Sequence, residues 1–171
     1  TIYGETCAAI GLVFFARRML TLETKGEYAD VMERALYNGV LSGMQLDGKK
    51  FFYVNPLEVL PEACLKDQRK HHVKVQRQKW FGCACCPPNV IRLLASLEDY
   101  IYSVSGRDVY IHLYVGGSLE ADAEGRAVRL DVKTNYPWEG SVAIAVQENA
   151  DFALKLRVPG WCKKWHVKVN G

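Results

Sequence analysis

The sequence predicts an α+β protein in which a helical region comes first and a β-sandwich follows. Apolar residues recur at the spacing of an α-helix up to about residue 105, and they alternate with polar residues after Ser105 and Gly106. Helices followed by strands are typical of α+β proteins rather than of alternating α/β folds. We therefore expect a helical region at residues 1–105 and an incomplete antiparallel β-sandwich at residues 106–171.

Three helices are predicted in the first region. Residues 7–20 are apolar on nearly all sides, which is typical of a helix inside a structure. Residues 27–44 carry apolar side chains four residues apart and predict an amphipathic helix. Pro87 and Pro88 begin the third helix, because proline is favoured in a first turn. The apolar stripe of the third helix consists of Val90, Leu94, Leu97 and Ile101.

The segments between these helices are predicted to be a short strand and a loop. Residues 51–54 are expected to form the strand, whereas residues 61–79 are irregular and polar. The basic side chains of this second segment have few aromatic neighbours, so we expect a solvated loop rather than a nucleic-acid-binding surface.

Five short strands are predicted after residue 106, because large apolar residues alternate there with polar ones and turn residues separate the runs. These strands lie at residues 109–115, 128–132, 142–146, 152–158 and 167–169.

The composition excludes several classes of protein. With 171 residues, of which 49% are hydrophobic and 24% charged, the chain can bury a core and is not disordered. The net charge of +3 gives no reason to expect nucleic-acid binding. The longest uncharged apolar run, residues 7–16, is about half of a membrane span and predicts neither a transmembrane helix nor a signal peptide. We therefore expect no nucleic-acid or membrane partner and a cytoplasmic location.

The two ends of the chain are typical of internal positions in a longer polypeptide. The chain begins with Thr1 instead of methionine, and the hairpin signal at Asn170 and Gly171 has no second strand after it. We therefore expect the rest of the same polypeptide to be a partner of this segment.

Three of the six cysteines lie within residues 83–86, at the start of the third predicted helix, and Glu5 and Cys7 lie at the start of the first. The dipole and free N–H groups of a helix N-terminus stabilise anions and lower the pKa of a thiol. One carboxylate and three thiols would also satisfy a four-coordinate zinc site. The sequence therefore predicts either a metal site or a reactive thiol.

Two other interpretations of the cysteine cluster remain open. Disulfides would need an oxidising compartment, and a bridge between the adjacent Cys85 and Cys86 would be strained. Inert packing is common for free cysteines and is expected for Cys64 and Cys162. The spacing also differs from the C-x-x-C pattern of zinc ribbons, so spacing alone does not decide between these interpretations.

Four motifs together resemble one family, glycoside hydrolase family 127, the β-L-arabinofuranosidases. The motifs are GETC at 4–7, YADVMERALYNG at 28–39, FYVNPL at 52–57 and WFGCACCPPN at 80–89. The resemblance implies an (α/α)6 barrel followed by β-sandwich domains, so this chain would contain the C-terminal part of the barrel and the start of a sandwich.

The resemblance also implies an activity, a metal and a set of site residues. The family's zinc ligands fall on Glu5, Cys7, Cys85 and Cys86, and its nucleophile falls on Cys85. A substrate-contacting tyrosine matches Tyr53, whereas the acid/base glutamate of the family would lie before Thr1. The implied activity is that of a retaining exo-glycosidase acting on an arabinofuranoside or a related pentoside, with a glycosyl thioether as its intermediate. A homodimer is a further expectation, and residues 1–171 alone are expected to be inactive.

The alternative function is a zinc-stabilised module without catalytic activity, whose β-sandwich binds carbohydrate or a protein. A thiol-redox protein is a weaker candidate, because the chain lacks the C-x-x-C motif of that class.

Overall fold

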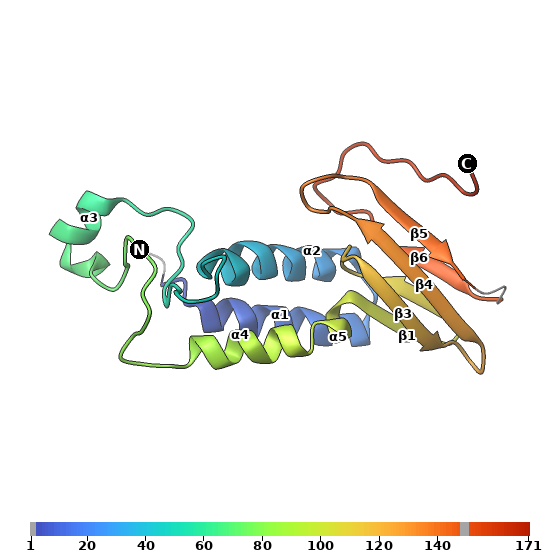
Figure 1. Cartoon of the computed structure of the whole chain (residues 1–171), viewed down its shortest axis with the longest axis horizontal. Helices are drawn as coiled ribbons and strands as arrows, with labels where there is room; N and C mark the ends of the chain where they lie inside the picture. Colours follow the sequence, from blue (N-terminus) through green and yellow to red (C-terminus); the bar gives the residue numbers. More distant parts are fainter. Residues whose placement is uncertain (1–2, 148–150) are drawn as a thin grey trace. The chain divides into compact units, whose positions relative to one another are not determined.

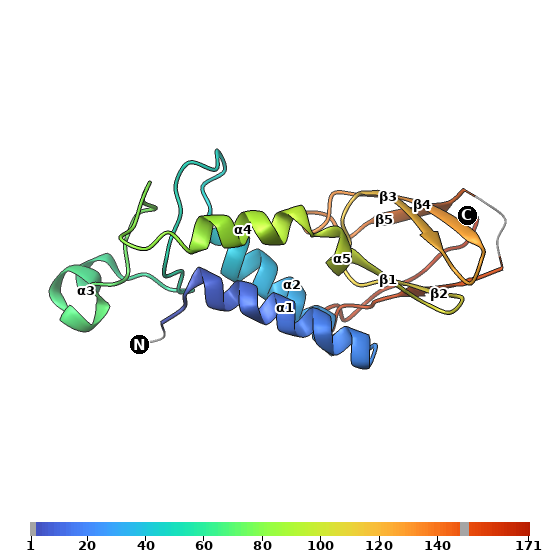
Figure 2. The same cartoon turned by 90° about the horizontal axis from the view of Figure 1, so that it is seen from below.

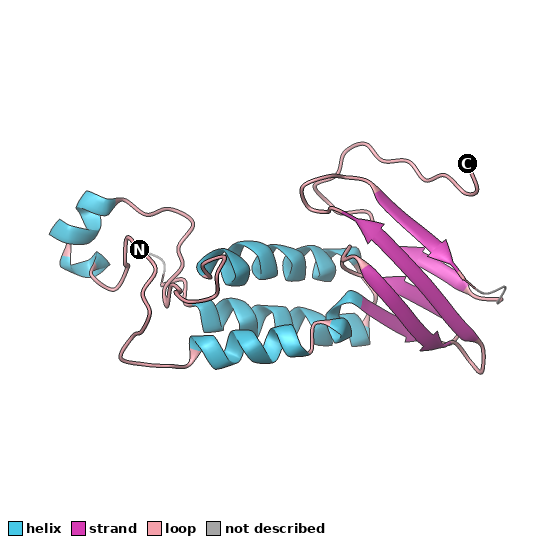
Figure 3. Cartoon of the chain, viewed as in Figure 1, coloured by secondary structure: helices cyan, strands magenta, loops and turns pink. Residues whose placement is uncertain are grey.

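The computed structural model describes residues 3–147 and 151–171 and contains both helices and sheets (Figures 1 and 3). The chain divides into two compact units, Thr1–Ser96 and Leu97–Gly171. The long helices belong to the first unit and the strands belong to the second. The α+β prediction is therefore confirmed, whereas the (α/α)6 barrel stays a prediction.

The first helix, α1 (Thr6–Leu22), is covered on one side within its unit and exposed on the other. Its buried residues recur every three or four positions, as on a packed helix face. They are Thr6, Ile10, Val13, Ala16 and Leu20. Leu12 and Phe15 lie on the other side and are 44% and 60% exposed. Residues of this chain therefore cover one face of α1, and burial on nearly all sides stays a prediction for the longer protein.

The second helical segment changes its hydrogen-bond geometry along its length. The helix α2 (Gly26–Arg34) continues into a π-helical turn, η1 (Ala35–Val40), and a 3-10 turn, η2 (Leu41–Gly43), where the sequence predicts one amphipathic helix. The side-chain amide of Asn55 donates to the carbonyl oxygen of Gly39 at 3.3 Å. A β-carbon added at Gly39 would lie 2.7 Å from Cβ of Ala9, so η1 packs closely against α1.

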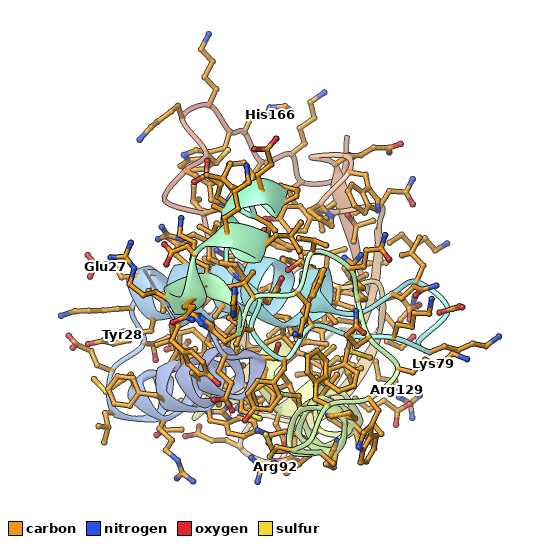
Figure 4. The ribbon with its side chains drawn as sticks, turned by 90° about the vertical axis from the view of Figure 1, so that its left-hand side faces the viewer. Glu27, Tyr28, Lys79, Arg92, Arg129 and His166 are labelled. Atoms are coloured by element: carbon orange, nitrogen blue, oxygen red, sulfur yellow. The ribbon has the colours of Figure 1, made fainter. Side chains whose placement is uncertain are left out.

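The helix α4 (Cys86–Ala95) lies beside α1 and runs in the same direction (Figures 1 and 2). Its first turn contains prolines, as predicted. The guanidinium of Arg92, labelled in Figure 4, lies over the ring of Phe14 on α1, 4.6 Å from the ring centroid. The first residues of α1 and α4 therefore lie at the same end of the helix pair. The helix α4 ends well before the predicted end at Ile101.

The loops of the first unit contain more structure than the sequence predicts. The short helix α3 (Pro61–Lys66) and the 3-10 turn η3 (Gln68–Lys70) lie in the segment expected to be irregular. The predicted strand at residues 51–54 is reduced to isolated bridges, of which one joins Val54 to Glu5. Cys64 is buried, as predicted. None of the helices in the described part of the chain is both long and apolar enough to cross a membrane.

The second unit begins with the short helix α5 (Glu98–Ile101) and contains two three-stranded sheets. One sheet has the order β1-β2-β6 and the other has the order β3-β4-β5. The strands are β1 (Tyr102–Ser105), β2 (Asp108–Ile111), β3 (Gly117–Asp122), β4 (Ala127–Thr134), β5 (Val142–Val146) and β6 (Ala153–Leu156). Val109 and Leu154 of the first sheet share one apolar core with Leu130 and Ile144 of the second. The two sheets therefore pack face to face, as in a sandwich.

The strands differ from the prediction in three respects. The strands β1 and β3 were not expected, and β2 pairs with β6 in parallel, register Val109 with Leu154, instead of antiparallel. Residues 167–169, which the alternation predicts as a strand, belong to no strand of the structure. Val167 and Val169 are exposed there, and an alternating segment becomes a strand only when a neighbour satisfies its backbone groups. Cys162, expected to be buried, is only partly so.

Candidate metal and catalytic centre

Four side chains from two distant parts of the sequence meet where α1 and α4 begin. Glu5 and Cys7 lie at the start of α1, and Cys85 and Cys86 lie at the start of α4. One ligand atom from each of these four residues lies within 4.8 Å of the others. The parallel arrangement of α1 and α4 places both helix N-termini at one end of the pair, which brings these residues together (Figure 1).

The distances between these atoms fit a tetrahedral metal site. The Sγ atom of Cys7 lies 3.4 Å from Sγ of Cys85 and 3.7 Å from Sγ of Cys86, and the two adjacent thiols are 3.8 Å apart. Oε1 of Glu5 lies 3.6 Å from Sγ of Cys85. Four ligands about 2.3 Å from a central ion, the Zn–S distance, are separated by roughly 3.8 Å at the edges of the tetrahedron. Three thiolates and one carboxylate also form a donor set that suits zinc.

The same distances argue against disulfides. A disulfide joins two sulfur atoms at about 2.05 Å, and all six cysteines of this chain are free thiols. The disulfide interpretation of the cluster is therefore wrong for this structure.

The thiol of Cys86 does not have the lowered pKa that its helix N-terminus predicts. Burial, together with the hydrogen bond and charge of Cys7, raises the pKa of the Cys86 thiol well above its usual range. Several acidic groups within one small volume disfavour the loss of each further proton. A bound cation reverses this preference because it stabilises the thiolates. The chemistry of the cluster therefore fits a metal ion.

Cys85 and Cys86 differ in accessibility although they are adjacent in sequence. Cys86 is 1% exposed, whereas Cys85 is only half-buried and contacts Tyr53, whose hydroxyl oxygen lies 3.5 Å from Sγ of Cys85. Hydrogen bonding with the thiols of Cys85 and then Cys83 raises the pKa of the Tyr53 hydroxyl. A tyrosine hydroxyl, with an ordinary pKa of about 10, is protonated at neutral pH even without this effect. Cys83 itself is exposed and does not belong to the four-residue cluster.

Aromatic contacts hold Tyr53 in place beside the cluster. The ring centroids of Phe81 and Tyr53 lie 5.7 Å apart, and those of Phe81 and Phe51 lie 5.0 Å apart. Both pairs of rings are tilted relative to each other. Trp80, the neighbour of Phe81 in the sequence, is 67% exposed. Phe81 therefore supports the tyrosine.

A cavity of about 990 Å³ opens beside Glu5, between α1, α2, η1 and the loop that follows Asn55. Of the four clustered residues, Glu5 lines this cavity. The polar residues of its lining include Arg34, Asn38, Glu58 and Lys70. A mostly apolar cavity of this size with a few polar groups is typical of sites that bind a small molecule.

Sequence reasoning missed three buried or supporting residues of this region. Thr6, between Glu5 and Cys7, is 2% exposed, and its hydroxyl donates to the carbonyl oxygen of Phe52 at 2.9 Å. Glu33 on α2 is 4% exposed, which is unusual for a carboxylate. The amide of Asn55 donates to the hydroxyl of Ser42 at 2.8 Å. Because each role depends on tertiary contacts, no pattern in the sequence identifies these residues.

Both parts of the chain match models of known protein families. Residues 1–99 match the family model described as the GH127 catalytic domain of β-L-arabinofuranosidase. Residues 108–171 match the model of the GH127 middle domain. The two matches meet close to the point where the helices give way to strands.

A curated relative is the non-reducing end β-L-arabinofuranosidase of Bifidobacterium longum subsp. longum, which is 43% identical over 179 residues. The alignment covers 100% of this chain and 27% of that protein, so the chain spans about a quarter of the relative's length.

Solved structures show the same similarity. The crystal structure of a GH127 β-L-arabinofuranosidase from Geobacillus stearothermophilus superposes with a TM-score of 0.88 at 57% identity, covering 95% of this chain and 26% of that one. A GH127 β-arabinofuranosidase structure superposes with a TM-score of 0.82 at 43% identity, covering 94% and 24%. From the two matched domains and these relatives it follows that the chain belongs to glycoside hydrolase family 127.

Proposed function

We propose that the whole protein is a retaining exo-glycoside hydrolase that releases β-L-arabinofuranose or a related pentofuranose, with Cys85 as its nucleophile. Relatives described as β-L-arabinofuranosidases support the substrate class. The observation that carries the proposal is the cluster of Glu5, Cys7, Cys85 and Cys86, in which the half-buried thiol of Cys85 is hydrogen-bonded to a tyrosine.

Glu5, Cys7, Cys85 and Cys86 would hold zinc in this proposal. When bound, zinc supplies positive charge that keeps the thiols deprotonated at neutral pH. Cys86, buried against α1, would fix the position of the cluster, whereas Cys85 faces the accessible side.

The reaction takes two steps. In the first step, an electron pair on Cys85 Sγ forms a bond to the anomeric carbon while the bond from that carbon to the leaving oxygen breaks. A carboxylic acid on the opposite side of the sugar donates a proton to the leaving oxygen. In the family this acid is a glutamate that the resemblance places before Thr1. In the second step, water forms a bond to the anomeric carbon, the carbon–sulfur bond breaks, and the carboxylate takes the proton from water. Two displacements retain the anomeric configuration.

Tyr53 would act on the same sulfur atom. Because its hydroxyl is protonated, it can donate a hydrogen bond to the Cys85 thiolate or to a sugar hydroxyl close by. A hydrogen bond to the departing thiolate would stabilise the charge that returns to Sγ in the second step.

Trapping the intermediate in the full-length protein tests the proposal. A pentofuranosyl probe that forms a stable adduct with the nucleophile is added, and the digested protein is analysed by peptide mass spectrometry. The adduct is expected on Cys85, and the same probe should leave a Cys85→Ala variant unlabelled. An adduct on a carboxylate, or on Cys86 with Cys85 free, would contradict the assignment. Zinc without any hydrolysis or adduct would favour the non-catalytic zinc module instead.

A further inference from the structure

Thr6 is enclosed between two of the proposed zinc ligands and a segment far away in sequence. It is the first residue of α1, stands between Glu5 and Cys7, and is 2% exposed. Its backbone N–H donates to the carbonyl oxygen of Tyr53 at 2.9 Å. Its hydroxyl donates to the carbonyl oxygen of Phe52, also at 2.9 Å. Thr6 therefore binds both peptide carbonyls of the Phe52–Tyr53 segment.

The neighbouring backbone groups complete this attachment. The N–H of Asn55 donates to the carbonyl oxygen of Gly4 at 2.7 Å, and Val54 pairs with Glu5 in an isolated bridge. On the other side, the N–H of Phe52 donates to the carbonyl oxygen of Gly43 at 3.0 Å. A β-carbon added at Gly43 would lie 3.2 Å from Nδ2 of Asn55 and 3.5 Å from the Thr6 hydroxyl oxygen, so Gly43 packs against both side chains.

Two chains of contacts connect Thr6 to the reacting sulfur atom, one through Cys7 and one through Tyr53. Thr6 is covalently joined to Cys7, whose Sγ lies 3.4 Å from Sγ of Cys85. Thr6 is also hydrogen-bonded to the main chain of Tyr53, whose hydroxyl lies 3.5 Å from the same Sγ of Cys85. A displacement of the Phe52–Tyr53 segment relative to Thr6 would therefore change the distance between the tyrosine hydroxyl and the sulfur.

We infer that Thr6 is a positioning residue, whose buried hydroxyl holds the Tyr53 hydroxyl against Cys85 Sγ. The inference rests on the proposed function, because it takes Cys85 as the reacting residue. Valine has nearly the shape of threonine but donates no hydrogen bond, so it would leave the Phe52 carbonyl oxygen without the Thr6 donor. Residues that orient the groups bound to a metal commonly affect activity or metal affinity by about 10- to 100-fold.

The test compares Thr6→Val with Thr6→Ser in the full-length protein. The matched control is Thr21→Val, because the Thr21 hydroxyl also donates to a backbone carbonyl of α1, that of Arg18 at 2.6 Å, but is exposed. We measure kcat and KM separately on an aryl β-L-arabinofuranoside and determine crystal structures of the variants. We expect Thr6→Val to lower kcat by about 10- to 100-fold with KM nearly unchanged, and to lengthen the distance from the Tyr53 hydroxyl to Cys85 Sγ. Thr6→Ser should restore most of kcat, and Thr21→Val should behave as the unaltered protein.

Two results would overturn the inference. The first is a Thr6→Val protein with an unchanged kcat and an unchanged contact between Tyr53 and Cys85. The second is a Thr6→Ser protein as slow as Thr6→Val, which would show that shape matters and the hydroxyl does not. Failure of the proposed function looks different, because the unaltered protein would then show no hydrolysis or cysteine adduct. The crystal structures would still decide whether the Thr6 hydroxyl sets the contact.

Discussion

Sγ of Cys7 lies 3.4 Å from Sγ of Cys85, although 78 positions of the sequence separate the two residues. Neither residue could approach the other through local structure. Their contact depends on the parallel packing of α1 against α4, which the ring of Phe14 and the guanidinium of Arg92 support from the middle of the helices. The cluster is therefore a property of the helix pair.

The first prediction concerns zinc content. Elemental analysis of the full-length protein should find about one zinc per chain, because four ligand atoms converge at distances that fit one tetrahedral ion. The variants Cys7→Ser and Cys86→Ser should each lose most of this zinc. Cys162→Ser, which changes a cysteine of the second unit, is the control and should keep it. Full zinc content in both ligand variants would disprove the four-ligand assignment.

The second prediction separates catalysis from metal binding at Tyr53. Tyr53→Phe removes the hydroxyl that lies 3.5 Å from Cys85 Sγ and leaves the ring packed on Phe81. We expect kcat to fall by roughly 10- to 100-fold while the zinc content stays unchanged. Tyr110→Phe in the second unit, whose hydroxyl donates to Asp108 at 3.1 Å, is the control. An unchanged kcat for Tyr53→Phe would show that the hydroxyl takes no part in the reaction.

The third prediction concerns the 171-residue chain produced by itself. It spans 27% of the curated relative, and Leu12 and Phe15 of α1 are exposed. We expect it to release no arabinose and to associate through this apolar face. Light scattering should detect the association, and Phe15→Glu should reduce it. A monomeric chain that hydrolyses a β-L-arabinofuranoside would contradict both expectations.

The fourth prediction compares two glycines by the sign of their effect on stability. Gly39→Ala would place a β-carbon 2.7 Å from Cβ of Ala9, so it should lower the melting temperature, at a cost of about 1–3 kcal/mol. Gly11→Ala in α1 meets no atom within 4 Å and should stabilise the helix by about 0.5–1 kcal/mol. Ala9→Gly should rescue Gly39→Ala. Equal effects at both glycines would show that η1 does not pack on α1 as described.

The fifth prediction concerns the carboxylate of Asp67. Its hydrogen bonds with the side chain and then the backbone N–H of Arg69 lower its pKa to about 2. Because the pKa is lower in the folded than in the unfolded protein, the interaction contributes stability above about pH 4. This contribution is lost as the pH falls towards 2. Carboxyl NMR titration should give this pKa, and Arg69→Gln should raise it towards about 3.9. Lys70→Gln, which removes only a neighbouring charge, should change it less.

Helices and strands with strong local sequence signals were predicted correctly, whereas features that depend on distant contacts were not. The helix α1 and the start of α4 were predicted, because a long apolar run and two prolines are local features. The strands β4 and β5 were predicted from their strict alternation. The π-helical turn was not, because it is supported by Asn55 from a loop after the helix. The parallel pairing of β2 with β6 was not predicted. Alternation determines which side of a strand is buried, but it does not determine which strand lies beside it.

The candidate site shows the same limit. The spacing of Cys83, Cys85 and Cys86 left metal binding, disulfides and packing open, and the resemblance to the family selected the four ligands. The structure brings these four residues together, and their role as metal ligands stays a prediction. The buried hydroxyl of Thr6 and the support of Tyr53 by Phe81 depend on segments that only the folded chain brings together.

The separation of the ligand pairs along the chain also has a kinetic consequence. Before α1 and α4 dock, Glu5 with Cys7 and Cys85 with Cys86 would be two separate pairs of proposed ligands. Residues 8–84 connect the pairs, and bringing together the ends of so long a segment is entropically unfavourable. Four-coordinate binding of the proposed zinc would therefore follow docking or drive it, and its uptake would be coupled to one tertiary folding step. In a refolding experiment, the rate at which bound zinc becomes resistant to a chelator would therefore report the rate at which these two helices dock.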